Sequence, residues 1–276
     1  DPYQGSPYAS CKSSGISIPA YSPTVIYLPK DVSAVKKAVY EYGGVISSMY
    51  TGGFLMSAYL NRNDHTFYYN GTEPLDHSVQ IVGWDDNIEV NGGFDSPKGS
   101  KGAWIVKNSW GLEWADEGYF YVAYDDSKFL SSVSVFPERT KKSEIDTLYM
   151  YDELGATTSF GFREEIAYGL VKYTAPDQHF IGKIGTFINT SGTMIDIEIY
   201  DDFQGDSLLT NLIAASYGNL NKFPGYATFD IPAIVEGDYY VKVMYHTPGY
   251  SYPIPAETKI SFQGEDYAVP NLLNSG

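Results

Sequence analysis

The segment 194–200, MIDIEIY, constrains the fold more than any other, because the character of its side chains alternates from one residue to the next. Three isoleucines, at 195, 197 and 199, alternate with Asp196, Glu198 and Tyr200. Successive side chains of a β-strand point to opposite faces of a sheet. This period of two therefore predicts a strand with one buried face and one solvated face.

Similar runs recur through the second half of the chain, separated by clusters of turn residues. Strand segments of about 5–8 residues, separated by regularly spaced turns, are typical of all-β sandwiches. We therefore predict a β-sandwich over residues 145–276. The runs that carry this prediction are Ile181–Asn189, Met194–Tyr200, Gly225–Ile231 and Asp238–His246.

The first half contains one convincing helix. Asp31 is a suitable N-cap, apolar residues recur at helical spacing from Val32 to Tyr42, and Gly43-Gly44 forms a stop signal. Strands are predicted at Val45–Tyr50, Ser78–Trp84, Ala103–Lys107 and Gly118–Ala123, with a Gly-, Asp- and Asn-rich loop at 85–102. A composition shift near Phe136-Pro137 predicts a first domain over 1–137, a linker over 138–144 and a second domain over 145–276.

Charge and cysteine usage exclude several classes of protein. There are 34 Asp and Glu residues against 18 Lys and Arg, and this net charge of −16 repels phosphate backbones, so no nucleic-acid partner is expected. One cysteine cannot form an internal disulfide framework. No apolar run is long enough for a membrane span. The chain opens at Asp1 in a loop-like segment without a start Met, so we expect it to be a piece of a longer or processed protein.

Two segments carry candidate chemistry: DHSVQIVGW at 76–84 and WIVKNSWG at 104–111, which continues through Trp114 to GYF at 118–120. A thiol nucleophile needs an imidazole that holds the thiolate and later protonates the leaving amine. The imidazole needs a third group that fixes its tautomer. A strand that starts with His77 and a neighbouring strand that ends in Asn108-Ser109-Trp110 can bring such groups together. An aromatic ring laid over a His–Asn hydrogen bond excludes water from it and strengthens it.

These segments resemble the C-terminal half of the papain family of cysteine peptidases, whose pattern there is [N/D]-H-[A/S]-V followed by W-x-[V/I/L]-K-N-S-W-G-x-x-W and G-Y. The resemblance implies that His77 is the catalytic histidine, that Asn108 orients it, and that Trp110 and Asp76 support the pair. It also implies a β-barrel-like right lobe, so the expected fold class is α+β followed by an all-β sandwich. Ser48, Met49 and Leu75 become candidates for the substrate pocket.

The chain departs from the family pattern at three places. Ala115 replaces the glycine usual after the second tryptophan, Gly44 stands where proline precedes the strand, and the loop 85–102 is long. The family's nucleophilic cysteine and oxyanion glutamine lie far upstream of the histidine, and no segment here matches them. Cys11 lies in a Ser/Lys/Gly loop without a helix start to lower its pKa, and it matches a family cysteine that forms a structural disulfide.

Three explanations of the missing half stay open: a truncated sequence, one chain of a nicked protein, or a half-domain that has lost catalysis. The first two imply a papain-like endopeptidase whose partner is the N-terminal part carrying the cysteine. The alternative is a non-catalytic adhesin that binds a cell-surface glycan or protein.

Residues 145–276 resemble the lectin-like domain that follows the catalytic domain in some bacterial and archaeal surface proteases. The resemblance implies an extracellular or cell-surface location. No cofactor is required for thiol catalysis. A calcium site at Asp201, Asp202 and Asp206 is a further candidate, because carboxylates are hard oxygen ligands.

Overall fold

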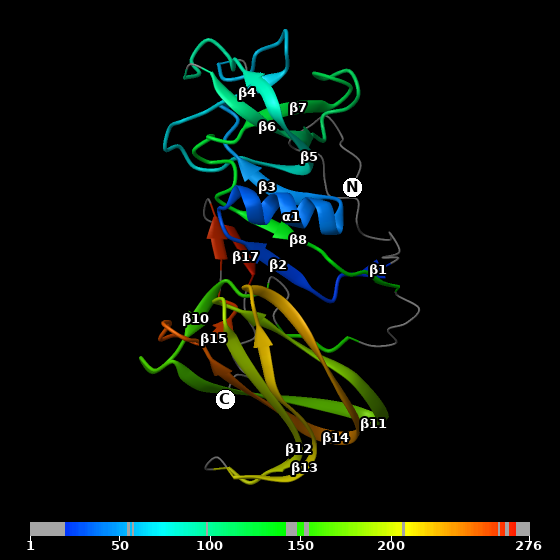
Figure 1. Cartoon of the computed structure of the whole chain (residues 1–276). Coiled ribbons are helices and arrows are strands. Elements are labelled where there is room, and N and C mark those ends of the chain that lie inside the picture. Colours follow the sequence, from blue (N-terminus) through cyan, green and yellow to red (C-terminus); the bar gives the residue numbers. More distant parts are fainter. Residues whose placement is uncertain are drawn as a thin grey trace. The chain divides into compact units, whose positions relative to one another are not determined.

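The computed structural model describes residues 20–53, 56, 58–97, 99–141, 148–151, 155–205, 208–258, 260–262 and 265–268 (Figure 1). Cys11, Asp206 and residues 142–144 of the expected linker lie outside these ranges. The chain divides into two compact units. The first consists of residues 1–20 and 27–137, and the second of residues 21–26 and 138–276.

The first unit contains helix α1 (Val32–Tyr42) and a mostly antiparallel sheet. As predicted, Asp31 caps α1, accepting a hydrogen bond of 2.7 Å from the backbone N–H of Ala34. Gly43 follows with a φ of 87°, a conformation that glycine adopts without a steric penalty. Val35, Ala38 and Val39 form the buried face of the helix. The predicted helix is thus confirmed in both its bounds and its caps.

The sheet of the first unit has the order β8-β3-β5-β6-β7-β4. All neighbours pair antiparallel except β4 and β7, which pair parallel. Its core includes completely buried side chains from each of the four central strands, among them Met49, Ile81, Trp104 and Phe120. The strands are β3 (Val45–Met49), β4 (Thr66–Phe67), β5 (His77–Val90), β6 (Ser100–Lys107), β7 (Tyr119–Ala123) and β8 (Val133–Val135).

The predicted loop at 85–102 is wrong in its bounds. Strand β5 continues to Val90 and β6 already begins at Ser100. The pairing jumps from Asp85↔Ala103 to Glu89↔Lys101, so a bulge takes up the extra residues of β5. Polar and glycine-rich composition indicates turns, but here the cross-strand hydrogen bonds outweigh that local preference.

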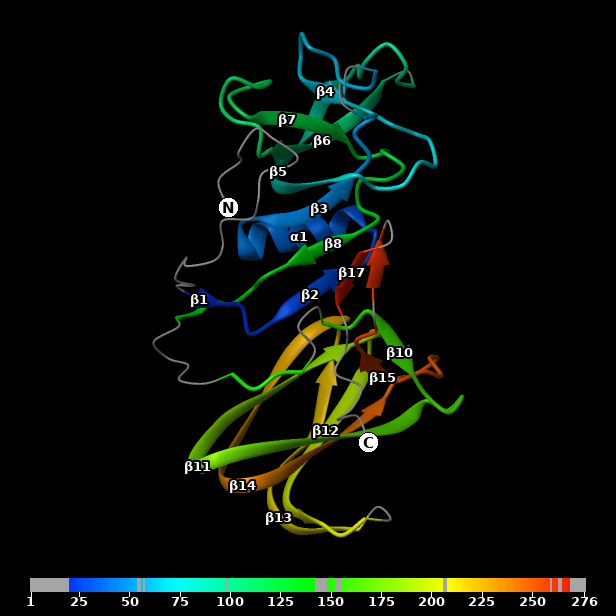
Figure 2. The same ribbon diagram turned by 180° about the vertical axis from the view of Figure 1, so that it is seen from behind.

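The second unit is built on a long two-stranded ribbon. Strand β11 (Ile166–Ile188) pairs antiparallel with β14 (Gly225–His246) from end to end (Figure 2). The register of this pairing shifts between Ala175 and His179, where the ribbon bends. Gly237, the cross-strand partner of Ala175, has a φ of 71°. The runs Gly225–Ile231 and Asp238–His246, predicted as two strands, therefore lie in one bent strand.

The bend places the two halves of the ribbon in two layers around one core. Strands β12 (Thr193–Phe203) and β13 (Leu209–Asn221) extend the layer that contains the C-terminal half of β14. Ile195, Ile197 and Ile199 are completely buried in this core, and Glu198 is not, as the alternation predicts. Core residues come from both halves of β14, for example Ile231 and Val241.

Short strands complete the secondary structure. In the second unit, β10 pairs with β15 and β16 with β17. Val25 and Ile26 pair with Gly225 and Tyr226, where a side chain on Gly225 would collide with the carbonyl of Val25. The bounds are β1 (Ala20–Tyr21), β2 (Val25–Leu28), β9 (Thr140–Lys141), β10 (Thr158–Phe160), β15 (Ile254–Ala256), β16 (Ile260–Phe262) and β17 (Glu265–Ala268).

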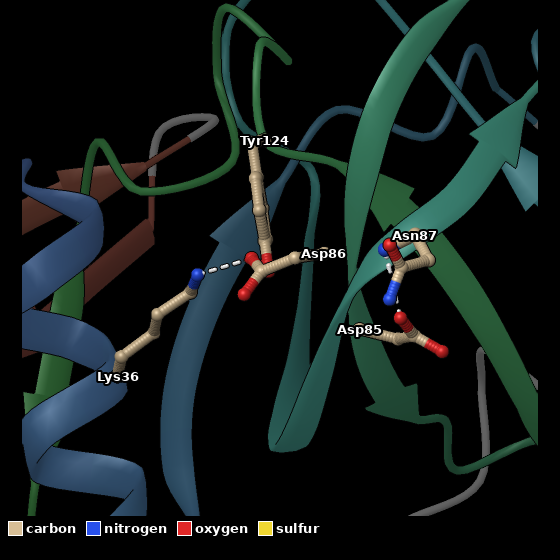
Figure 3. A network of polar contacts seen from close by, with 5 residues as sticks. All are labelled: Lys36, Asp85, Asp86, Asn87 and Tyr124. Carbon is tan, nitrogen blue, oxygen red and sulfur yellow. Dashed lines mark hydrogen bonds and ion pairs between the residues drawn. The ribbon is translucent and has the colours of Figure 1, made fainter.

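A polar cluster joins α1 to the β5–β6 hairpin (Figure 3). Lys36 Nζ donates to Asp86 Oδ1 and lies 4.6 Å from the centre of the Tyr124 ring. Tyr124 donates its hydroxyl to the same carboxylate oxygen at 2.8 Å. The hydrogen bond from Lys36, then that from Tyr124, lowers the pKa of Asp86 below its usual value.

A lowered carboxyl pKa in the folded state adds stability above the unfolded value, and this stability is lost as the pH falls through the folded value. The free energy of unfolding of the wild type should therefore fall between about pH 5 and pH 2, in part because Asp86 becomes protonated. In Asp86→Asn this fall is expected to be smaller. Denaturant unfolding at each pH measures it. Asp85→Asn is the matched control, because the one hydrogen bond to the Asp85 carboxylate from the described residues is local, 2.8 Å from the Asn87 backbone N–H. An identical change in both variants would contradict the assignment.

Candidate active site

His77 and Asn108 come together because they occupy adjacent ends of two paired strands. His77 opens β5, and Asn108 directly follows the last residue of β6, with Gln80 opposite Lys107. The His77 Nε2 and Asn108 Oδ1 atoms are 2.9 Å apart. Since an amide oxygen only accepts, Nε2 carries the proton and donates it. The neutral ring then presents Nδ1 as its basic nitrogen.

The Asn108 side chain is held in place by its surroundings. It is only 8% exposed, and its Oδ1 also accepts the backbone N–H of Ser109 at 2.8 Å. The backbone N–H of Asn108 donates to the carbonyl of Gly118 at 2.9 Å, which closes the loop between β6 and β7. The buried Oδ1 atom thus accepts from two donors, the Ser109 N–H and His77 Nε2. This arrangement favours the imidazole tautomer that carries its proton on Nε2.

A chain of aromatic rings connects the site to the core. The Trp110 ring lies 5.1 Å from that of His77 at an interplanar angle of 32°. Trp114 packs edge-on against Trp110 at 5.1 Å, and Phe120 packs edge-on against Trp114 at 5.2 Å. Phe120 is completely buried. Trp110 is thus anchored beside the His77 ring by its packing against Trp114. Its role in limiting the access of water to the His77–Asn108 bond stays a prediction.

Asp76 has a partner that sequence reasoning missed. Its Oδ1 accepts the backbone N–H of Thr51, and its Oδ2 accepts the Thr51 hydroxyl, both at 2.8 Å. Thr51 lies in the loop that follows β3 and is 6% exposed. No spacing rule relates the two residues, since only the pairing of β3 with β5 brings them together.

The three residues predicted to line a substrate pocket lie beside His77. Met49 is its cross-strand partner, Ser48 is opposite Ser78, and Leu75 comes two residues before His77. The Ser48 and Ser78 hydroxyl oxygens are 3.2 Å apart. Leu75 is 37% exposed, whereas Met49 is completely buried. Their role in substrate binding stays a prediction.

The loop that carries both tryptophans contains several left-handed backbone conformations. Gly111 and Gly118 have φ values of 94° and 87°, while the non-glycine residues Ala115 and Glu117 have 50° and 51°. In L-residues this conformation brings Cβ close to the following carbonyl oxygen. A glycine is therefore the residue that position 115 favours, which accounts physically for the glycine that the family pattern has after the second tryptophan.

Ala115→Gly is accordingly expected to raise the unfolding free energy by about 1 kcal/mol, because it relieves the left-handed strain. Chemical denaturation measures the change. Ala34→Gly, inside α1, is the matched control and should lower the unfolding free energy by about 1 kcal/mol. Destabilisation by both substitutions would show that Ala115 is not strained.

The predicted calcium site is only partly within the described ranges. Asp202 Oδ2 accepts hydrogen bonds from Gln204 Nε2 at 2.9 Å and Thr210 Oγ1 at 2.8 Å. These bonds lower the pKa of Asp202. Among the residues that the structure describes, no three His, Cys, Asp or Glu side chains gather as metal ligands. Asp206 lies outside them, so calcium binding by Asp201, Asp202 and Asp206 stays a prediction.

In the described part of the chain, no helix has the length and apolar character that crossing a membrane requires.

Comparison with known families agrees with the fold. Residues 1–136 match the family model of the papain family cysteine proteases, and residues 148–269 match that of a lectin like domain. The chain thus contains a papain-family cysteine protease domain in its first half and a lectin-like domain in its second. The predicted fold class, a papain-type β-rich lobe followed by an all-β domain, is confirmed.

Three curated relatives match parts of the chain. Procathepsin L of Mus musculus is 32% identical over 119 residues, which are 42% of this chain and 32% of the relative. A senescence-specific cysteine protease, SAG12, of Arabidopsis thaliana is 32% identical over 135 residues, which are 45% of this chain and 32% of the relative. Serine-repeat antigen protein 5 of Plasmodium falciparum is 38% identical over 71 residues, 24% of this chain and 7% of the relative. The chain therefore spans a third or less of the length of these relatives.

Solved structures match the chain over both units. The clostridial cysteine protease Cwp84 after propeptide cleavage matches with a TM-score of 0.73 at 20% identity, over 92% of this chain and 64% of that one. The cysteine protease and lectin-like domains of Cwp84, described as a surface layer associated protein of Clostridium difficile, match with a TM-score of 0.70 at 20% identity, over 92% and 57%. At this identity the likeness shows the fold.

Proposed function

We propose that this chain is part of a secreted or cell-surface cysteine endopeptidase that hydrolyses peptide bonds in protein substrates. The observation that carries the proposal is the 2.9 Å hydrogen bond from His77 Nε2 to the buried amide oxygen of Asn108. The proposal assigns the nucleophilic cysteine to a part of the protein outside this chain.

Each residue has a defined role in the proposed reaction. His77 Nδ1 takes the proton of the attacking thiol, and the resulting imidazolium returns a proton to the leaving amine. Nε2 stays protonated throughout, so Asn108 Oδ1 holds the ring in both charge states without adding a negative charge. Trp110 keeps water away from this bond.

The cell-surface location is supported by two observations. A net charge of −16 favours solubility and disfavours phosphate backbones as partners. The structurally similar Cwp84 is described as a surface layer associated protein. The proposed chemistry requires no metal or organic cofactor, because imidazole and amide supply the proton transfer and orientation.

The full-length protein that contains this chain tests the proposal. His77→Ala is expected to lower kcat/KM for thiol-dependent peptide hydrolysis by about 100-fold or more, because it removes the general acid and base. Asn108→Ala should cause a smaller loss. His179→Ala, in the second unit, is the matched control and should keep wild-type activity. Full activity of His77→Ala would overturn the proposal.

A second candidate function is a surface module that binds glycans, either alongside the peptidase or in its place. One observation favours it: the second unit has an open cavity of about 330 Å³ with three tyrosines and a threonine in its lining. Tyr151 stacks on Tyr173 with ring centres 5.2 Å apart. Thr174 donates to Asp238 at 2.7 Å, next to the Lys172–Asp238 ion pair. Flat aromatic faces beside hydrogen-bonding groups suit a sugar ring.

Tyr151→Ala is therefore expected to abolish retention of the protein on an array of bacterial cell-wall glycans. Tyr217→Ala is the control, since Tyr217 is a 59% exposed tyrosine on β13 that does not line the cavity. Equal retention of wild type and Tyr151→Ala would exclude this cavity as the site. Retention that needs Tyr151 in a protein without peptidase activity would favour the adhesin alternative.

A further inference from the structure

His77 lies at the end of a strand pair, where the cross-strand hydrogen bonds open most readily. It forms the last cross-strand pair of β3 and β5, opposite Met49. The chain from Tyr68 to Asp76, which leads into it, has no regular secondary structure. Ends of strand pairs open more readily than their centres. Besides Asn108 and Trp110, the backbone that precedes His77 therefore contributes to the direction of the imidazole.

Thr51 and Asp76 extend the pairing beyond its last regular residues. The backbone N–H of Asp76 donates to the carbonyl of Met49 at 3.0 Å. In return, the Asp76 carboxylate accepts the backbone N–H and the hydroxyl of Thr51, each at 2.8 Å. Both carboxylate oxygens are thus used, one for each donor. This arrangement fixes the rotation of the Asp76 side chain and closes the end of the strand pair next to His77.

Among the described residues, the Thr51 hydroxyl has two acceptors within reach, and the contact with Asp76 is the stronger. Its single proton can go to Asp76 Oδ2 at 2.8 Å or to the carbonyl of Gly53 at 3.4 Å. A hydrogen bond to a charged carboxylate at the shorter distance is the stronger one. Because Thr51 is only 6% exposed, the loss of this acceptor would leave a nearly buried hydroxyl to be satisfied elsewhere.

We propose that Thr51 is a positioning residue for His77, and that it acts through the Asp76 carboxylate. Its hydroxyl holds Asp76, and Asp76 holds the backbone from which the imidazole projects toward Asn108. The inference rests on the proposed catalytic role of His77, but its consequence for the orientation of the ring is independent of peptidase activity.

Nitrogen-15 NMR of the histidine rings tests this in the protein itself at about pH 8, where an imidazole is neutral. The His77 signals are identified by their loss in His77→Gln. Wild type is expected to show His77 as the Nε2–H tautomer, with slow exchange of that proton with water. Thr51→Val, which keeps the shape and removes the hydroxyl, should speed this exchange about fivefold and shift the ring signals toward a mixture of tautomers. Thr51→Ser should restore both.

Thr186→Val is the matched control. Thr186 is also nearly buried and its hydroxyl shares a 2.7 Å hydrogen bond with that of Tyr245, but it lies in the second unit. It should leave the His77 signals unchanged. The proposal is overturned if Thr51→Val leaves them unchanged too, or if Thr51→Ser behaves like Thr51→Val. The proposed function is tested separately, by peptide hydrolysis with the full-length His77→Ala variant. The two tests can fail independently, because the histidine ring signals need no active nucleophile.

Discussion

The antiparallel pairing of β5 with β6 is the constraint on which the candidate site depends. It sets the start of one strand beside the end of the other, so that His77 and Asn108 meet although 31 positions separate them in the chain. Neither side chain would define a site alone. Once paired, the amide oxygen selects which imidazole nitrogen carries the proton, and this leaves the other nitrogen basic. The geometry of the candidate site is thus a consequence of the register of two strands.

The residues around His77 and Asn108 fix the geometry of the contact between them. On one side, Trp110, Trp114 and Phe120 link the imidazole to the core through edge-on and inclined ring packing. On the other side, the Thr51–Asp76 contact holds the backbone that enters β5. The loop that presents Trp110 includes Ala115 and Glu117 in left-handed conformations. Strain of this kind persists where the surrounding structure enforces it, and functional loops are a common place for it.

Local patterns were sufficient where each residue acts mainly on its neighbours. The cap at Asp31 and the stop at Gly43 follow from hydrogen bonds within one helical turn, and the alternation at 195–200 follows from strand geometry alone. Sequence reasoning failed where partners are distant. The bulge between Asp85 and Glu89 and the bend of β14 near Gly237 are set by cross-strand registers that no local preference encodes.

The amino-acid sequence by itself determined the class of the protein, because the motifs around His77 and Asn108 and the strand periodicity of the second half are local properties of the chain. Only the tertiary structure decided that His77 Nε2 faces Asn108 Oδ1 and that Asp76 is held by Thr51. It also decided that β11 and β14 form one bent ribbon around a shared core. The reason is physical: these features depend on which residues pair across strands, and the pairing is settled by burial and hydrogen bonding of the whole sheet.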